Sequence, residues 1–246
     1  MMTFSFLLPI WQTMPFGSRL AVLLRNAHDT AFAWIDSKTK EQSKPFPLQE
    51  RAYKYELVAL TKNKILFHQY DASVSIPVII GLCAYNLSGE LSWEVPFTQL
   101  LEVGASSIQV KFSAYGREEN QILSLDTGDI SAVFSPVPST KIELPELYRQ
   151  DSPHFKSFEM FLKRFEVKPH LGVEYLETER GIVLSFYERL EKGFRNHLWV
   201  IDNQQEVLEK VVLARHTKGL GQNTFWQQAR KVWMIEERKI VRFFSV

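Results

Sequence analysis

Three observations predict that this chain of 246 residues is all-β and forms a five-bladed β-propeller-like ring of four-stranded antiparallel sheets. Short apolar strands separated by turn residues recur every roughly 40–50 residues, which is the spacing of propeller blades. Aromatic residues, which favour strands, are abundant, with 18 Phe, 8 Tyr and 6 Trp. The second strands of the five repeats are centred on Leu23, Leu66, Val110, Leu184 and Met234. Two packed antiparallel sheets are the rival arrangement, which strand counting alone leaves open.

The first repeat follows a strand expected at Phe4–Trp11. Arg19–Arg25 and Thr30–Asp36 read as its next strands, and the polar segment Ser37–Lys44 as a solvated turn. Because the last repeat has only three strands of its own, we expect Phe4–Trp11 to complete its sheet and close the ring, which removes two open sheet edges. The whole of residues 1–246 is then a single domain.

The second repeat gives the clearest pattern, as two hairpins. Glu56–Thr61 pairs with Lys64–Tyr70, and Val78–Asn86 with Glu90–Val95 through a turn at Ser88-Gly89. Four strands of the third repeat are expected at Leu100–Val103, Ser107–Phe112, Gln121–Leu125 and Asp129–Phe134.

Tryptophan and cysteine side chains in these strands are interpreted as packing residues. Trp93 and Trp11 occupy fourth-strand positions, where an indole fills the gap between blades. Cys83, the single cysteine, lies in an alternating apolar run and is expected to be buried and inert.

An insertion at about residues 136–170 interrupts the repeats and is predicted to contain one helix. Asp151 or Ser152 is the expected N-cap, with Pro153 at the first helical position and the end near Arg164–Phe165. An apolar stripe follows at helical spacing, formed by Phe155, Phe158, Phe161, Leu162 and Phe165. We expect this stripe to pack on its own protein, with partner binding as the alternative.

The remaining strands complete the fourth and fifth repeats. They are expected at Val173–Thr178, Gly181–Glu188, Arg195–Asp202, Glu206–Arg215, Thr224–Ala229, Val232–Glu236 and Lys239–Phe244.

Two resemblances accompany this pattern. Ala84–Trp93 resembles the quinoprotein-like and WD-type propeller repeat. Taken whole, the chain resembles a Bacteroidetes-type family with a domain of unknown function, on Pro77–Glu94, Glu174–Tyr187, Asn196–Asp202 and Gly219–Phe225. The resemblance implies no activity. Quinoprotein cofactor sites often use a vicinal cysteine pair, so with one cysteine we infer no quinone and no other cofactor.

Composition and motifs exclude several classes of function. A net charge of +1 gives no field that steers the chain to nucleic acid or an anionic membrane. The start of the chain reads as neither a signal peptide nor a membrane span, so a cytoplasmic location is expected. The six histidines never occur at i, i+2 or i, i+4, which gives no support for a metal site. P-loop, dinucleotide and nucleophile-elbow motifs are lacking.

A non-catalytic binding or scaffold module, monomeric and with an unknown protein or small-molecule partner, is therefore the expected function. Its candidate binding residues are Arg51, Glu56, His68, Tyr70, Glu102, Glu174 and Tyr187. The alternative is a glycoside-type hydrolase, because Glu56, Glu102, Glu174 and Glu177 fall on or beside the strands that line a propeller channel, where paired carboxylates can act as acid and base.

Overall fold

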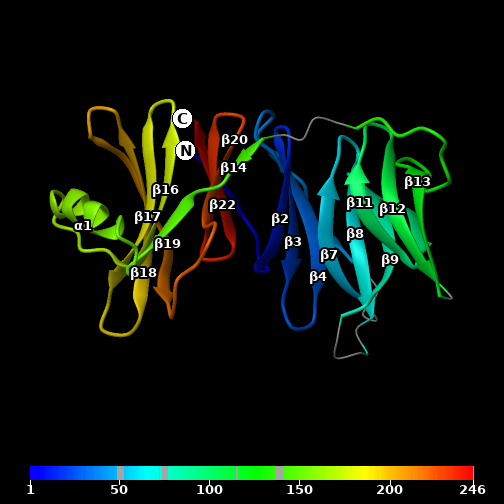
Figure 1. The fold of residues 1–246 in the computed structure, drawn as a ribbon, viewed down its shortest axis with the longest axis horizontal. Coiled ribbons are helices and arrows are strands. Elements are labelled where there is room, and N and C mark those ends of the chain that lie inside the picture. The colour runs from blue at the N-terminus through cyan, green and yellow to red at the C-terminus, as the bar shows by residue number, and fades with distance from the viewer. Residues whose placement is uncertain (49–52, 72, 74–76, 115, 137–140, 246) are drawn as a thin grey trace. The chain divides into compact units, whose positions relative to one another are not determined.

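The computed structural model describes residues 1–48, 53–71, 73, 77–114, 116–136 and 141–245 (Figure 1). These residues form five antiparallel sheets and one short helix, so the all-β prediction is confirmed. The chain divides into a contiguous unit, Leu8–Thr140, and a split unit, Met1–Leu7 with Lys141–Val246. In chain order, one sheet corresponds to each predicted repeat; ring closure and the single domain stay predictions.

The contiguous unit contains the first three sheets. The first consists of β2 (Ile10–Phe16), β3 (Arg19–Arg25), β4 (Thr30–Asp36) and β5 (Glu41–Gln42), with β6 (Phe46–Pro47) also paired to β4. The second consists of β7 (Tyr53–Leu60), β8 (Lys64–Asp71), β9 (Ile79–Asn86) and β10 (Leu91–Pro96). The third has only β11 (Thr98–Val103), β12 (Ser107–Ala114) and β13 (Arg117–Ser124).

The split unit contains the fourth and fifth sheets, each with five strands. The fourth consists of β15 (Glu146–Arg149), β16 (His170–Thr178), β17 (Gly181–Arg189), β18 (Phe194–Asp202) and β19 (Val207–Thr217). The fifth consists of β14 (Ile142–Glu143), β20 (Phe225–Gln228), β21 (Lys231–Glu236), β22 (Ile240–Ser245) and β1 (Met2–Ser5).

The strand at the start of the chain pairs as expected but is shorter than predicted. β1 is antiparallel to β22, with Phe4 opposite Val241, so it does complete the last sheet. A single strand over Phe4–Trp11 was wrong, because β1 ends at Ser5 and β2 begins at Ile10 in a different sheet. Pro9, which has no N–H for a ladder, lies in the bend between them.

The third sheet lacks the predicted fourth strand at Asp129–Phe134. Only an isolated bridge between Leu123 and Ile130 remains of it. After this bridge the chain turns to β11, where Pro136 bridges Gly104. The expectation of four strands in every sheet was therefore wrong here.

Apolar layers join consecutive sheets of the contiguous unit. Between the first two sheets, Leu23 and Phe32 pack with Leu57, Phe67 and the buried Cys83. Between the second and third sheets, the Trp93 indole packs with side chains of both sheets, among them Leu66, Leu82, Val110 and Leu123. The expected packing roles of Cys83 and Trp93 are confirmed.

A tryptophan from one sheet also donates to the turn of the next, twice. Trp34 Nε1 donates to the Leu87 carbonyl at 2.8 Å, and Trp93 Nε1 to the Leu125 carbonyl at 2.9 Å. The glycines of these two turns lie under aromatic rings: a Cβ on Gly89 would clash with Phe46, and one on Gly128 would meet Trp93 at 3.0 Å. The repeated turn glycine therefore allows close contact between sheets.

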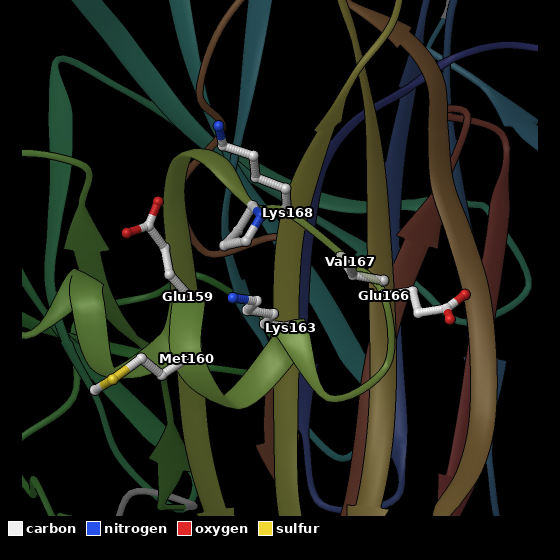
Figure 2. A pocket seen from close by; sticks show the side chains of 7 residues that line it. Glu159, Met160, Lys163, Glu166, Val167 and Lys168 are labelled. Carbon is white, nitrogen blue, oxygen red and sulfur yellow. The ribbon is translucent and has the colours of Figure 1, made fainter.

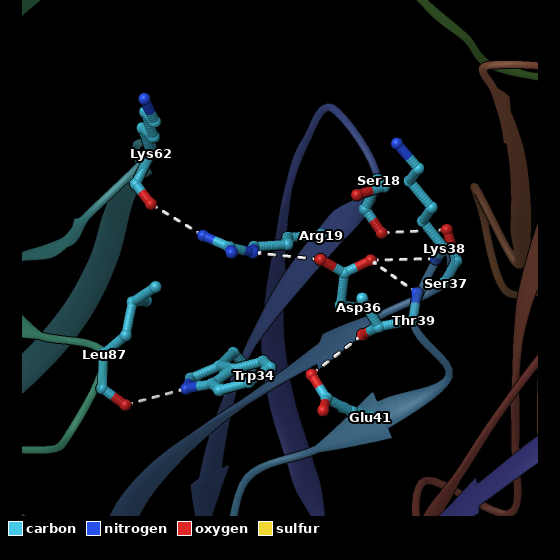
Figure 3. A network of polar contacts seen from close by, with 10 residues as sticks. All are labelled: Ser18, Arg19, Trp34, Asp36, Ser37, Lys38, Thr39, Glu41, Lys62 and Leu87. Carbon is cyan, nitrogen blue, oxygen red and sulfur yellow. Dashed lines mark hydrogen bonds and ion pairs between the residues drawn. The ribbon is translucent and has the colours of Figure 1, made fainter.

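A polar network supports the first of these contacts (Figure 3). Arg19 donates from Nε to Asp36 at 3.1 Å and from its terminal nitrogen to the Lys62 carbonyl at 2.6 Å, which links the first and second sheets. Burial alone would raise the pKa of Asp36, but hydrogen bonds from the Lys38 N–H, Ser18 and Arg19 outweigh it and hold that pKa below its ordinary value. Asp36 thus stays charged and orients Arg19.

Trp11 does not have the packing role expected of it. Its side chain is 53% exposed, on β2, and lies beside the Arg25 guanidinium, which is 5.3 Å from the ring centre. The prediction failed because Trp11 belongs to the first strand of the first sheet and not to the last strand of the fifth.

The insertion contains a helix, α1 (Phe155–Lys163), as predicted, and it also contributes strands β14 and β15 to the two sheets of the split unit. The expected N-cap and Pro153 were wrong, since Asp151–Pro153 lie in turns and His154 precedes the helix without a side-chain cap. The end at Arg164 is confirmed. Phe155 and Leu162 are buried against Val173, Phe186 and Trp199 of the fourth sheet, so the stripe packs on its own protein.

Candidate functional site

Glu56, His68 and Tyr70 come together on neighbouring strands of the second sheet. His68 is 6% exposed on β8, opposite Glu56 of β7. Its Nδ1 lies 3.5 Å from the Glu56 carboxylate, and the Tyr70 hydroxyl donates to the same carboxylate. All three were candidate binding residues from the sequence, and the structure places them on one face, at alternate positions of β8 and a facing position of β7.

The second nitrogen of His68 has a backbone hydrogen-bond partner. Nε2 accepts the Leu100 N–H of β11 at 2.9 Å, so the proton of the neutral ring lies on Nδ1, toward Glu56. Burial lowers the pKa of His68, and the Glu56 carboxylate offsets this only in part. His68 is therefore neutral at pH 7 and joins the second and third sheets of the contiguous unit.

The phenol of this cluster is held in its protonated form. Burial, followed by the hydrogen bond to Glu56, raises the pKa of Tyr70 to about 12. Glu56, whose side chain is 41% exposed, is the member of the cluster that solvent reaches most easily. The three groups can bind a polar ligand through that carboxylate, but neither His68 nitrogen is free to accept a proton from one.

Glu174 lies in a different network, inside the split unit. It is fully buried on β16 and accepts the Thr224 N–H, at 3.3 and 3.2 Å to its two oxygens, as well as the Thr224 hydroxyl. The same hydroxyl contacts Ser185 Oγ at 3.0 Å, and Ser185 donates to Asn196 at 3.0 Å. Burial raises the pKa of Glu174, while its hydrogen bonds with Thr224 oppose the rise.

Tyr187 belongs to this network and not to an open surface. Its side chain is 1% exposed, and its hydroxyl accepts the Gly221 N–H at 2.7 Å and an Asn196 N–H at 3.4 Å. Burial raises the pKa of Tyr187. Through their hydrogen bonds with Gly221 and Thr224, Tyr187 and Glu174 hold the loop before β20 against the fourth sheet. Sequence spacing alone did not reveal this role.

The other candidates are separate from these two clusters. Glu102 is exposed on β11, and Glu177 is exposed on β16, where it accepts a hydrogen bond from Tyr175 at 2.5 Å. Arg51 lies outside the described residues, so the structure says nothing of its role.

A pocket beside α1 was not found from the sequence. It has a volume of about 490 Å³ and is lined by Glu159, Met160, Lys163, Glu166, Val167, Lys168 and Pro169. Figure 2 shows Glu159, Lys163 and Lys168 around it, on α1 and on the segment that follows. Met160 is 67% exposed. The signal available in the sequence was the charged face of the helix, with Glu159 and Lys163, whereas the sequence analysis considered only the apolar stripe.

The described residues contain no metal-binding group and no helix able to cross a membrane. Within the described ranges, no group of three His, Cys, Asp or Glu side chains is arranged to hold a metal ion. No helix in the described part of the chain has the length and apolar character needed to cross a membrane.

Comparisons with known proteins show distant structural likenesses but no family. No protein-family model and no curated protein matches the chain. Among solved structures, it is similar to the crystal structure of AztD from Citrobacter koseri, with 8% sequence identity and a TM-score of 0.30. The match covers 96% of this chain and 58% of that chain, so this chain spans less than two thirds of its length. A TM-score this low carries no argument about function.

Proposed function

We propose that the chain is a non-catalytic binding module. The observation that carries this is the engagement of its best acid–base candidates with backbone amides: Glu174 accepts the Thr224 N–H, and His68 accepts the Leu100 N–H. Groups used this way stabilise the fold and are not available to take a proton from a substrate.

Glycoside hydrolysis is the second candidate, and one observation favours it: the raised pKa of Glu174, which suits a general acid. Such an acid must reach the glycosidic oxygen and face a second carboxylate at about 5–10 Å. The full burial of Glu174 argues against that access. The clustered Glu56 has an exposed carboxylate, but its neighbours are a neutral imidazole and a phenol.

For the architecture, we propose that the five sheets form a closed five-bladed propeller-like ring in a monomer located in the bacterial cytoplasm. Five successive sheets and the pairing of β1 with β22 support it. A compact chain of this length has a radius of gyration of about 18 Å. Small-angle scattering that gave more than about 22 Å would contradict a closed ring.

A glycoside panel tests the absence of catalysis. Purified chain should turn over none of a set of aryl α- and β-glycosides between pH 4 and 8. Turnover that disappeared in Glu174→Gln, and persisted in the control Glu206→Gln, would overturn the binding-module proposal. Glu206 is a fair control because it is an exposed carboxylate between β18 and β19 of the same sheet and is not among the candidate catalytic glutamates.

A further inference from the structure

The third sheet is one strand short, and β13 is its open edge (Figure 1). β13 pairs with β12 along its whole length, from Ala114 opposite Arg117 to Ser107 opposite Ser124. In an antiparallel ladder, successive residues direct their N–H and C=O groups to opposite sides. Every second residue of β13 therefore directs its backbone groups away from β12.

The chain itself identifies which residues these are. The Ser124 N–H donates to the Asp129 carbonyl at 2.7 Å, and the Ser131 N–H donates to the Ile122 carbonyl at 2.8 Å. Ile122 and Ser124 thus face outward, and by alternation so do Glu118 and Asn120. No described residue bonds the outward N–H of Ile122 or the N–H and C=O groups of Asn120 and Glu118.

A fourth strand begins beside β13 and then leaves it. Residues 129–131 occupy its first positions, antiparallel to β13. Ser135 then accepts the Ala105 N–H at 2.9 Å on the opposite side of the sheet. The diversion leaves a position for an added strand beside the first part of β13, at Glu118 and Asn120, and this position ends where Ser131 lies opposite Ile122. Two apolar side chains of the diverted segment are largely exposed, Ile130 at 77% and Val133 at 67%.

The charges of the edge indicate what can occupy it. Glu118 and Glu119 are exposed on opposite faces of β13, and Glu118 also pairs with Lys111 at 2.7 Å. A second copy is disfavoured as the occupant. If the β13 strands of two copies paired antiparallel without overlapping Ser131 of either copy, the pairing would centre on Glu119. The Glu119 carboxylates of the two copies would then lie directly opposite each other. Lysine or arginine at those facing positions would instead pair with the glutamates.

We propose that β13 takes up an extended segment of a partner protein, with basic residues opposite Glu118 and Glu119, as the antiparallel fourth strand of the third sheet. The added strand satisfies the outward amides and carbonyls of Glu118 and Asn120. The inference rests on the proposed binding function and supplies its partner class and its surface.

A synthetic nine-residue peptide is the probe, made of valine and threonine with lysine at two adjacent central positions. One control peptide has proline in place of a central valine, which removes a donor at unchanged charge, and another has glutamate in place of both lysines. Binding to the full chain is followed by fluorescence anisotropy. Amide hydrogen exchange, read by NMR, locates the bound peptide.

Asn120→Pro is the decisive variant. The Asn120 N–H faces away from β12, so proline removes an edge donor without breaking the ladder within the sheet. Asn120→Thr is the matched control, because it keeps the N–H. We expect the lysine peptide to slow exchange at Glu118 and Asn120. Its affinity should fall about tenfold in Asn120→Pro and stay within about twofold in Asn120→Thr.

Several results would overturn the proposal: equal binding of the proline peptide, no binding of the lysine peptide at millimolar concentration, or edge amides already protected in the free chain. A dimer that Asn120→Pro converts to monomer would identify a second copy as the occupant and reject a basic partner. If the circular dichroism of Asn120→Pro showed that it had not folded, Glu119→Lys would be the test variant instead. It should bind the glutamate peptide more tightly than the lysine peptide, and an unchanged preference for the lysine peptide would overturn the proposal. Failure here leaves the glycoside result, and with it the binding-module proposal, untouched.

Discussion

Replacing Trp93 with alanine should weaken the contact between the second and third sheets more than any other single change on that contact. The indole is 7% exposed and is surrounded by side chains of both sheets. A buried tryptophan removes 150–250 Å² from water, which at about 25 cal/mol per Å² gives an upper limit of about 6 kcal/mol. The Leu125 carbonyl also loses its donor, at a cost of about 1 kcal/mol.

Partial relaxation around the cavity reduces the total, so we expect Trp93→Ala to lower the free energy of unfolding by about 3–5 kcal/mol. Urea unfolding followed by far-UV circular dichroism measures it, provided that the m-value is unchanged. Trp93→Phe keeps one aromatic ring but loses the N–H and part of the indole volume, so its loss should be smaller, about 1–3 kcal/mol. Trp11→Ala is the control, because Trp11 is 53% exposed, and should cost about 1 kcal/mol or less. Equal losses for Trp93→Ala and Trp11→Ala would refute the assigned role of Trp93.

Three more predictions concern buried groups. Because burial raises the pKa of Glu174, its contribution to stability is fully present below the ordinary value near 4.5 and declines as pH rises through the folded pKa; Glu174→Gln should flatten that decline in thermal melts. Burial lowers the pKa of His68, so its contribution to the free energy of unfolding is lost as pH falls below about 6.5. The free energy of unfolding of His68→Gln should therefore fall less between pH 7 and pH 5 than that of the unchanged chain. An equal fall in both would contradict this. Leu162→Asp should cost about 3 kcal/mol or more in urea unfolding, against less than about 0.5 for the exposed Met160→Asp; similar values would mean that α1 does not pack as described.

Local pattern predicted the strands well where alternation and turn residues agreed. The hairpin ending at Trp93 and the pairing of the first strand with the last sheet followed from such signals and from strand counting. Phe4–Trp11 was misread because its apolar run continues across Pro9, and only tertiary pairing shows that the two halves join different sheets.

The candidate site was predictable only in part. Glu56, His68 and Tyr70 are close in sequence and face one another across one hairpin, so their convergence was within reach of sequence reasoning. The partners of Glu174 are not: Thr224 is 50 residues away, and it was predicted to begin a strand, whereas β20 begins at Phe225 and Thr224 lies in the loop before it. The diversion of residues 132–136 from β13 to β11 gives only a late sequence signal, since Val133 and Phe134 suit a strand and the first proline comes at Pro136.

The pairing of β1 with β22 has a consequence for synthesis on the ribosome. β1 emerges before the other described strands, but its partner spans Ile240–Ser245, so it must wait while more than 200 residues are added. At about 5–20 residues per second this delay is roughly 10–50 s. The contiguous unit, Leu8–Thr140, can fold during that time, because none of its described strands pairs outside it. A nascent chain stalled before residue 240 should therefore have a protease-resistant Leu8–Thr140 segment and a β1 still open to cleavage.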